Sequence, residues 1–170
     1  MNPRQLAVLG VGAVAATIAA GGVSPVRGLR LEASATYNDS AVSEPAPALL
    51  VAFGRMSRVP NVAGFAGRVG VDYQRDLNET LALRLNGWAR YVGRSRLGVG
   101  PVLGEAQGDY LDTALTLRIG RPDLGLTIGA TNLTDEIGNR FALGTPFPIG
   151  RGQITPLRPR TIRIGLDANF

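Results

Sequence analysis

Six segments of this sequence alternate between apolar and other residues, and each is about 9 to 12 residues long. Such a period of two is typical of a β-strand with one apolar and one polar face. Strands of soluble sheets average about 5 or 6 residues, whereas a tilted strand needs about 9 to 11 to cross a bilayer. The sequence therefore predicts an all-β protein with membrane-spanning strands. The six segments are residues 29–38, 65–74, 81–91, 111–120, 124–133 and 161–170.

The connections between these segments alternate in length. Arg75–Glu79 and Arg121–Asp123 are tight turns, whereas residues 39–62, 93–109 and 134–159 are long connections. Long loops are uncommon in compact soluble domains, but outer-membrane barrels have short periplasmic turns and long extracellular loops. We therefore expect an antiparallel up-and-down meander of about six long strands that forms part of a transmembrane β-barrel.

The two faces of the expected strands differ in chemistry. Leu, Ile and Val dominate one face, and we expect this face to meet lipid. In a bilayer every backbone polar group must be paired, and a closed barrel achieves this for β-strands. The other face carries charges that suit a watery or plugged lumen, and we expect them to form cross-strand pairs inside the wall. These lumen-facing charges are Arg68, Asp72, Arg84, Asp112, Arg118, Arg163 and Asp167.

Aromatic residues fall near the ends of the expected strands, as in the interfacial girdles of membrane barrels. Trp88 is the exception, because it has the parity of the polar face and fits no girdle. The residues near one end are Tyr37, Phe65 and Tyr91, and those near the other are Tyr73 and Phe170.

Composition argues against most enzyme classes. The 170 residues include no cysteine, histidine or lysine, so zinc, haem and iron–sulfur sites lose their usual ligands, and catalysis that uses a Cys or His nucleophile or base loses its groups. No phosphate loop or nucleophile elbow occurs either. The net charge of +5 comes from scattered arginines without an RNA-binding motif. We expect no enzyme activity, no cofactor or metal, and no nucleic-acid partner.

The first 25 residues differ from the rest. An apolar run from Leu6 to Ala20 follows Arg4 and ends in small residues, as in a signal peptide. The run is 15 residues long, which is short for a spanning helix of about 20 residues. We expect a signal-like or helical apolar segment over residues 1–25 and barrel strands over residues 26–170. The alternative is a degenerate strand that precedes a turn at Ser24–Gly28.

Three stretches resemble the barrel of TonB-dependent outer-membrane receptors. NLTDEIGNRF, Asn132–Phe141, is similar to the Asn-Leu-x-Asp segment after the penultimate strand of that family. PLRPRTIRIGLDANF, Pro156–Phe170, resembles the final strand, which ends in Phe. VRGLRLEASATYNDS, Val26–Ser40, resembles a strand that leads into an extracellular loop.

The resemblance implies a location, partners and a function. Ile164, Leu166 and Phe170 would form the terminal signal read by the barrel-assembly machinery. The protein would lie among the lipids of the cell outer membrane of a Gram-negative bacterium. A full-length receptor would take up a siderophore or similar nutrient, with a ferric siderophore as ligand. Arg140 and Arg151, in the longest loop region, are candidate contacts for an anionic ligand, although solvated loop charges explain them as well.

The sequence also departs from that family. Its members have a TonB box, a plug and about 22 barrel strands, whereas this chain has room for six clear strands and at most a seventh. TonB would act only through a plug, which has no counterpart here. We therefore expect the C-terminal part of a receptor, from a truncated or remodelled gene, with two unpaired sheet edges.

Two other functions fit the same strands. The first is a small structural or adhesive outer-membrane β-protein without transport activity. The second is a soluble β-barrel that binds an apolar ligand, which requires the Leu and Ile face to point inward and the arginine face to point outward.

Overall fold

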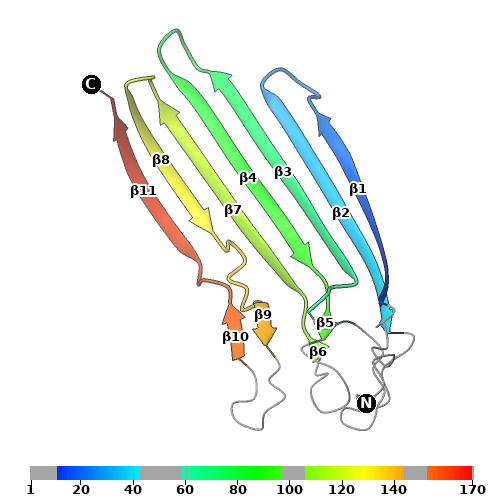
Figure 1. The fold of residues 1–170 in the computed structure, drawn as a ribbon. Helices are drawn as coiled ribbons and strands as arrows, with labels where there is room; N and C mark the ends of the chain where they lie inside the picture. The colour runs from blue at the N-terminus through cyan, green and yellow to red at the C-terminus, as the bar shows by residue number, and fades with distance from the viewer. Residues whose placement is uncertain (1–10, 43–58, 60, 97–105, 144–152, 170) are drawn as a thin grey trace, which may run out of the picture.

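The computed structural model describes residues 11–42, 59, 61–96, 106–143 and 153–169, and every regular element among them is a β-strand (Figure 1). In this described part no helix is long and apolar enough to cross a membrane. The strands are β1 (Val11–Val23), β2 (Leu29–Val42), β3 (Phe65–Asp76), β4 (Ala82–Val92), β5 (Ser95–Arg96), β6 (Ala106–Gln107), β7 (Tyr110–Gly120), β8 (Leu124–Thr131), β9 (Asn139–Leu143), β10 (Gln153–Pro156) and β11 (Thr161–Ala168).

In the described part of the chain, seven long strands form one sheet in the order β1-β2-β3-β4-β7-β8-β11. Every neighbouring pair is antiparallel, so the sheet is an up-and-down meander. The predicted fold class is thus confirmed, and six of the strands coincide with the six alternating segments. The strand over residues 124–131, for example, begins at the predicted residue.

The N-terminal apolar run differs from the favoured prediction. Val11–Val23 forms β1, which pairs with β2 from Val11↔Val42 to Val23↔Leu31, so the strand alternative holds for these residues in place of a helix. The edge of β2 offers backbone groups that β1 pairs with, and Gly21 and Gly22 disfavour a helix. That residues 1–25 act as a signal-like segment stays a prediction.

The short turns lie at one end of the sheet together with the C-terminal end of β11 (Figure 1). The turn between β1 and β2 closes with a hydrogen bond from Leu29 N to Val26 O (3.1 Å), and Gly28 adopts a φ of 82° there. A side chain at Gly28 would collide with the carbonyl of Gln74, so this turn requires glycine. The predicted tight turn at Arg121–Asp123 is confirmed. A tight turn also follows β3, but it covers residues 77–81 and not the predicted Arg75–Glu79, because β3 continues to Asp76.

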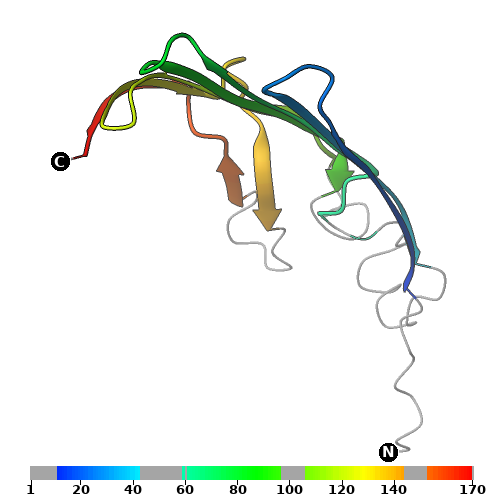
Figure 2. The same ribbon diagram turned by 90° about the horizontal axis from the view of Figure 1, so that it is seen from above.

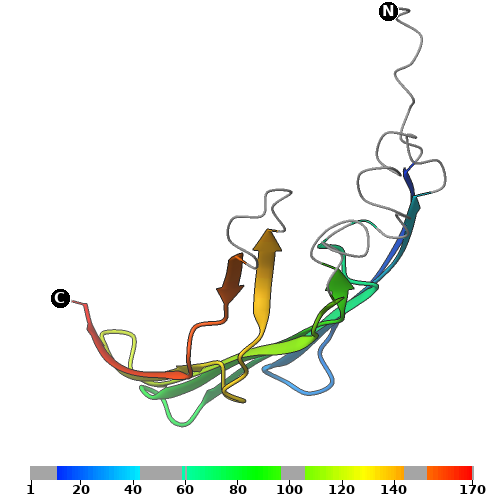
Figure 3. The same ribbon diagram turned by 90° about the horizontal axis from the view of Figure 1, so that it is seen from below.

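Two small hairpins occupy the opposite, long-loop end. β5 pairs with β6 and β9 pairs with β10, and both hairpins lie on the concave side of the curved sheet (Figures 2 and 3). The long connections therefore contain secondary structure that the alternation of the sequence did not reveal.

The polar face of the sheet is the concave one. Tyr110 has the parity of this face, and a side chain at Gly138 would collide with the Tyr110 ring and contact Leu157. Gly138 immediately precedes the hairpin of β9 and β10, which lies on the concave side (Figure 2). Residues of the same parity, including the predicted charges, therefore face the inside of the curve, and the apolar face is convex.

The convex face is exposed. Ile162, Ile164 and Leu166 of β11 are 68%, 74% and 80% exposed. Among the side chains that the structure describes, the only buried hydrophobic ones are Tyr110 and Leu157. The residues that the structure describes therefore form no second layer over the apolar face of the sheet, and such a face requires an apolar medium. Other exposed apolar residues of this face are Leu31, Val69, Leu115, Leu117, Ile119, Leu124, Leu126 and Ile128.

Candidate functional site

The concave face brings the predicted lumen charges onto one surface. Cross-strand register aligns them in rows: Arg68 lies opposite Arg90, which lies opposite Asp112, and Arg84 lies opposite Arg118. Neighbouring rows contain Asp72, Arg163 and Asp167, which are also on the polar face. That these charges face the lumen of a closed barrel stays a prediction.

One of the expected charge pairs forms between distant strands. Arg118 on β7 donates from Nε to Asp167 Oδ1 at 3.1 Å, and its Nη2 lies 2.5 Å from Asp167 Oδ2. The guanidinium passes over Gly125 of β8, where a Cβ would collide with it. The missing side chain of Gly125 thus lets an ion pair span two strand spacings.

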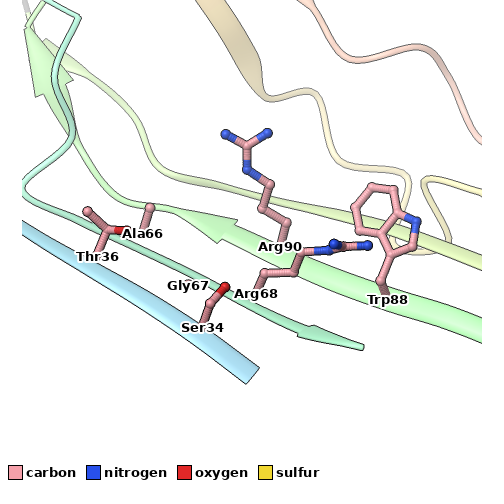
Figure 4. A pocket seen from close by; sticks show the side chains of 7 residues that line it. All are labelled: Ser34, Thr36, Ala66, Gly67, Arg68, Trp88 and Arg90. Atoms are coloured by element: carbon pink, nitrogen blue, oxygen red, sulfur yellow. The ribbon is translucent and has the colours of Figure 1, made fainter. Parts of the chain in front are cut away.

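Other polar residues make different contacts from those expected. Asp72 accepts a hydrogen bond from the Asn86 side-chain amide. Arg68 stacks on Trp88, with Cζ 5.4 Å from the ring centroid (Figure 4). This cation–π contact explains why Trp88 has polar-face parity, because the indole provides a surface for the guanidinium inside the curve.

Arg68, Trp88 and Arg90 line an open pocket of about 520 Å³. Arg68 and Arg90 are direct cross-strand neighbours of like charge, an arrangement that is unfavourable unless something compensates it. In Figure 4 the Arg90 side chain projects away from the sheet, beside the Arg68 side chain. The pocket has the chemistry of an anion site, with two guanidinium groups, hydroxyl groups and an aromatic face. Its remaining lining residues are Ser34, Thr36, Ala66 and Gly67.

The pocket lies near the long-loop ends of the strands. Arg68 is the fourth residue of β3 and Arg90 is the third from the end of β4. The sequence analysis named Arg68 but missed Arg90 and the role of Trp88. The alternation does contain the signal, because all three residues share the polar parity.

A buried asparagine organises the same end of the sheet. Asn132 is 3% exposed and has a φ of 51°. Its side-chain amide donates to the carbonyl oxygens of Glu136 and Arg158, each at 2.9 Å, and its Oδ1 accepts from Glu136 N at 2.8 Å. Asn132 thereby links the segment after β8 to the segment that leads into β11. In the sequence, Asn132 is distinguished only as the first residue of the segment that resembles TonB-dependent receptors.

The loop and terminal candidates are placed unevenly. Arg140 belongs to β9, but its side chain, like all of Arg151, lies outside what the structure describes. Ile164 and Leu166 lie on the convex face of β11, and Phe170 lies outside the described residues. Their predicted roles therefore stay predictions. Among the described residues, no group of three or more Asp or Glu side chains is placed to hold a metal ion.

Comparison with known proteins shows where this architecture occurs. No family model matches the chain, and no curated protein matches it significantly. Several solved structures, in contrast, match the chain. The ferric-catecholate import receptor Fiu from E. coli K12 matches 91% of the chain with a TM-score of 0.64 and 19% identity. The siderophore receptor PiuA from Acinetobacter baumannii matches 86% with a TM-score of 0.64 and 15% identity.

The chain has the fold of a receptor barrel segment. A third structure, the ferric preacinetobactin receptor BauA from A. baumannii, matches 85% of the chain with a TM-score of 0.54 and 17% identity. The chain spans 20% of each of the three receptors. The resemblance to the barrel portion of a TonB-dependent receptor is therefore confirmed at the level of the fold.

Proposed function

We propose that this chain forms part of the wall of an outer-membrane receptor that takes up a ferric siderophore or a similar nutrient. The proposal rests on the difference between the two faces of one curved sheet. The convex face has exposed Leu, Ile and Val, and the concave face has arginine and aspartate. Lipid suits the first face and a polar lumen suits the second. The likeness to three siderophore receptors supports the same assignment.

The role of this segment is to provide wall, lumen charge and loops. The pocket of Arg68, Trp88 and Arg90 would face an anionic ligand that enters from the long-loop side. Arg140 and Arg151 are proposed as further contacts in the loops. TonB would act through a plug, and the barrel wall would catalyse no reaction. The outer membrane of a Gram-negative bacterium is the proposed location.

A soluble barrel with an apolar interior is the opposite arrangement. It requires the Leu and Ile face inside the curve, whereas that face is convex and the arginine face is concave. The structure thus argues against this alternative. A structural outer-membrane protein without transport would share the wall, but no contact in the described residues favours it over a receptor.

Cysteine labelling tests the assignment of the two faces, because the chain contains no cysteine of its own. Thr116→Cys and Leu117→Cys place single thiols on opposite faces at adjacent positions of β7. In outer-membrane preparations, we expect Leu117→Cys to react with a lipid-soluble maleimide and to resist a charged one. Thr116→Cys should react with the charged maleimide. Equal reaction of both thiols with the charged reagent would refute the lipid-facing assignment.

The terminal signal is tested separately. We propose that Ile164, Leu166 and Phe170 are recognised by the barrel-assembly machinery, since two of these side chains are strongly exposed on the convex edge strand. Phe170→Ala should reduce the amount of chain recovered in the outer membrane, whereas Asn169→Ala, at the preceding position, should not. Equal recovery of both variants would count against this role for Phe170.

A further inference from the structure

An apolar groove indents the convex face beside β3. It has a volume of about 440 Å³ and lies over β2, β3 and β4. In register, Ala33 lies opposite Val69 and Val69 opposite Ala89, while Gly67 lies opposite Ala35 on one side and Tyr91 on the other. Its apolar lining includes Ala33, Val69, Ala89 and Leu111 of β7, with Phe65 and Tyr91 at one end. Ser34 and Arg68, which have the parity of the concave face, also border it.

Aromatic rings close the groove toward the long-loop end. Phe65 lies against Gly67, whose added Cβ would meet the Phe65 ring at 3.5 Å. The Phe65 and Tyr91 ring centroids are 6.2 Å apart with planes tilted by 42°. These rings have the position of an interfacial girdle, where aromatic side chains mark the level of lipid head groups. The groove itself therefore extends from the head-group level into the hydrocarbon region.

A charged pair adjoins this aromatic end. The Tyr91 hydroxyl donates to Asp109 Oδ2 at 2.7 Å, and Arg94 Nε lies 3.6 Å from Asp109 Oδ1. The hydrogen bond from Tyr91, more than the neighbouring Arg94, holds the pKa of the Asp109 carboxyl below its ordinary value, so Asp109 is ionised at neutral pH. Asp109 thus connects Arg94 to Tyr91, which is one of the lining residues of the groove. The Arg94 side chain is 83% exposed, which leaves donors for another anion.

Resting on the proposed function, we infer that this groove is a binding site for one acyl chain of a phosphate-bearing membrane lipid. Water does not fill an apolar groove in hydrocarbon surroundings, and an unfilled groove forfeits dispersion contacts. An acyl chain supplies those contacts. Arg94 then receives the lipid phosphate at the rim, which is the charge complementarity that selects a phosphorylated lipid over an uncharged one.

The test measures lipid retained by the tagged full chain after extraction from the outer membrane in mild detergent. Native mass spectrometry and lipid analysis of the purified chain identify the retained lipid. Ala89→Leu fills the groove, and Ala130→Leu makes the same change on the convex face of β8, outside it. We expect Ala89→Leu to lose the lipid and Ala130→Leu to keep it. Ala33→Leu, on a different strand of the groove, repeats the test if Ala89→Leu fails to fold.

A test variant and a matched control variant examine the contact between Arg94 and the lipid head group. Arg94→Gln should lower the retention of phosphate-bearing lipid about fivefold, as the loss of one arginine near the membrane surface would. Arg121→Gln is the control, because Arg121 pairs with Asp123 at 3.3 Å at the opposite, short-turn end. Retention of an uncharged lipid in place of a phosphorylated one would overturn the Arg94 assignment.

Other outcomes separate this inference from the proposed function. Equal retention in the Ala89→Leu and Ala130→Leu variants would show nonspecific surrounding lipid only and would overturn the site. A membrane-embedded chain that retains no lipid, or one that holds a protein partner over β2, β3 and β4, would overturn the site and leave the proposed function standing. A chain that stays folded and soluble without detergent would overturn both.

Discussion

Arg118 reaches Asp167 across an intervening strand because Gly125 offers no side chain in its path. The same guanidinium donates to the carbonyl oxygen of Arg121 at 3.0 Å, so it also holds the tight turn between β7 and β8. One residue without a side chain thus allows one charged side chain to connect β7, its following turn and β11. The pair is partly exposed, which limits how much it stabilises the sheet.

Gly125→Ala should displace the Arg118 guanidinium and weaken its pair with Asp167. We expect a small decrease in the urea midpoint and faster hydrogen exchange of β11 amides. Gly165→Ala is the control, because a Cβ at that position of β11 meets no atom within 4 Å. In an Asp167→Asn background the effect of Gly125→Ala should disappear, since both changes remove the same interaction. Additive effects of the two substitutions would contradict this explanation.

At the scale of elements, the hairpin of β9 and β10 is held at its base by several backbone and side-chain contacts. Leu157 N donates to Gly138 O at 2.8 Å, and Arg160 N donates to Asp135 Oδ1 at 3.1 Å. Leu133 N donates to the Thr113 hydroxyl at 2.8 Å. Together with the Asn132 contacts, these bonds fix where the chain leaves β8 and where it enters β11. The base of the hairpin is therefore fixed to the ends of β7, β8 and β11.

Asn132→Ala should loosen this base. It removes three side-chain hydrogen bonds and leaves partly buried backbone groups of Glu136 and Arg158 unpaired, at a cost of about 2 to 4 kcal/mol in unfolding free energy. Asn132→Gly separates backbone strain from hydrogen bonding, because glycine tolerates the φ of 51° but makes none of the side-chain bonds. We expect both variants to show faster hydrogen exchange of the backbone amides in residues 133–143 and 153–160. Protection like that of the unmodified chain in both would argue against the anchoring role.

At the scale of the whole sheet, the strands that the structure describes are odd in number, and this limits how the edges can pair. The seven strands are antiparallel throughout, so the two edge strands, β1 and β11, run in the same direction (Figure 1). Two copies in one membrane orientation would therefore meet β11 to β1 as parallel neighbours. To close this sheet into a barrel with antiparallel neighbours at both β1 and β11, an odd number of additional strands must lie between these two edges.

We therefore expect that copies of this chain do not close a barrel with each other. Semi-native electrophoresis of the chain in lipid should show no discrete band that changes migration on heating. The physical reason is that each seam between copies would be parallel, whereas bacterial outer-membrane barrels pair their strands antiparallel. A discrete heat-modifiable oligomer made only of this chain would contradict the expectation.

Local alternation predicted most of this fold. The position of each long strand after the first, the parity of Leu117 or Arg118 and the tight turn at Arg121–Asp123 follow from backbone geometry within a few residues. Even the two faces follow from it, because a period of two assigns every side chain to one side. The weakly patterned run at Val11–Val23 gave no such signal, and its pairing with β2 identified it as a strand.

Contacts between strands depend on register and curvature, which the alternation leaves open. Sequence analysis gave the polar parity of Arg68, Trp88 and Arg90, but register placed them side by side. The direction of curvature makes the polar face concave, and the absence of a side chain at Gly125 allows Arg118 to reach Asp167. A local pattern states which side a residue faces. Which residues it meets there is fixed by strands that are distant in the sequence and adjacent in space.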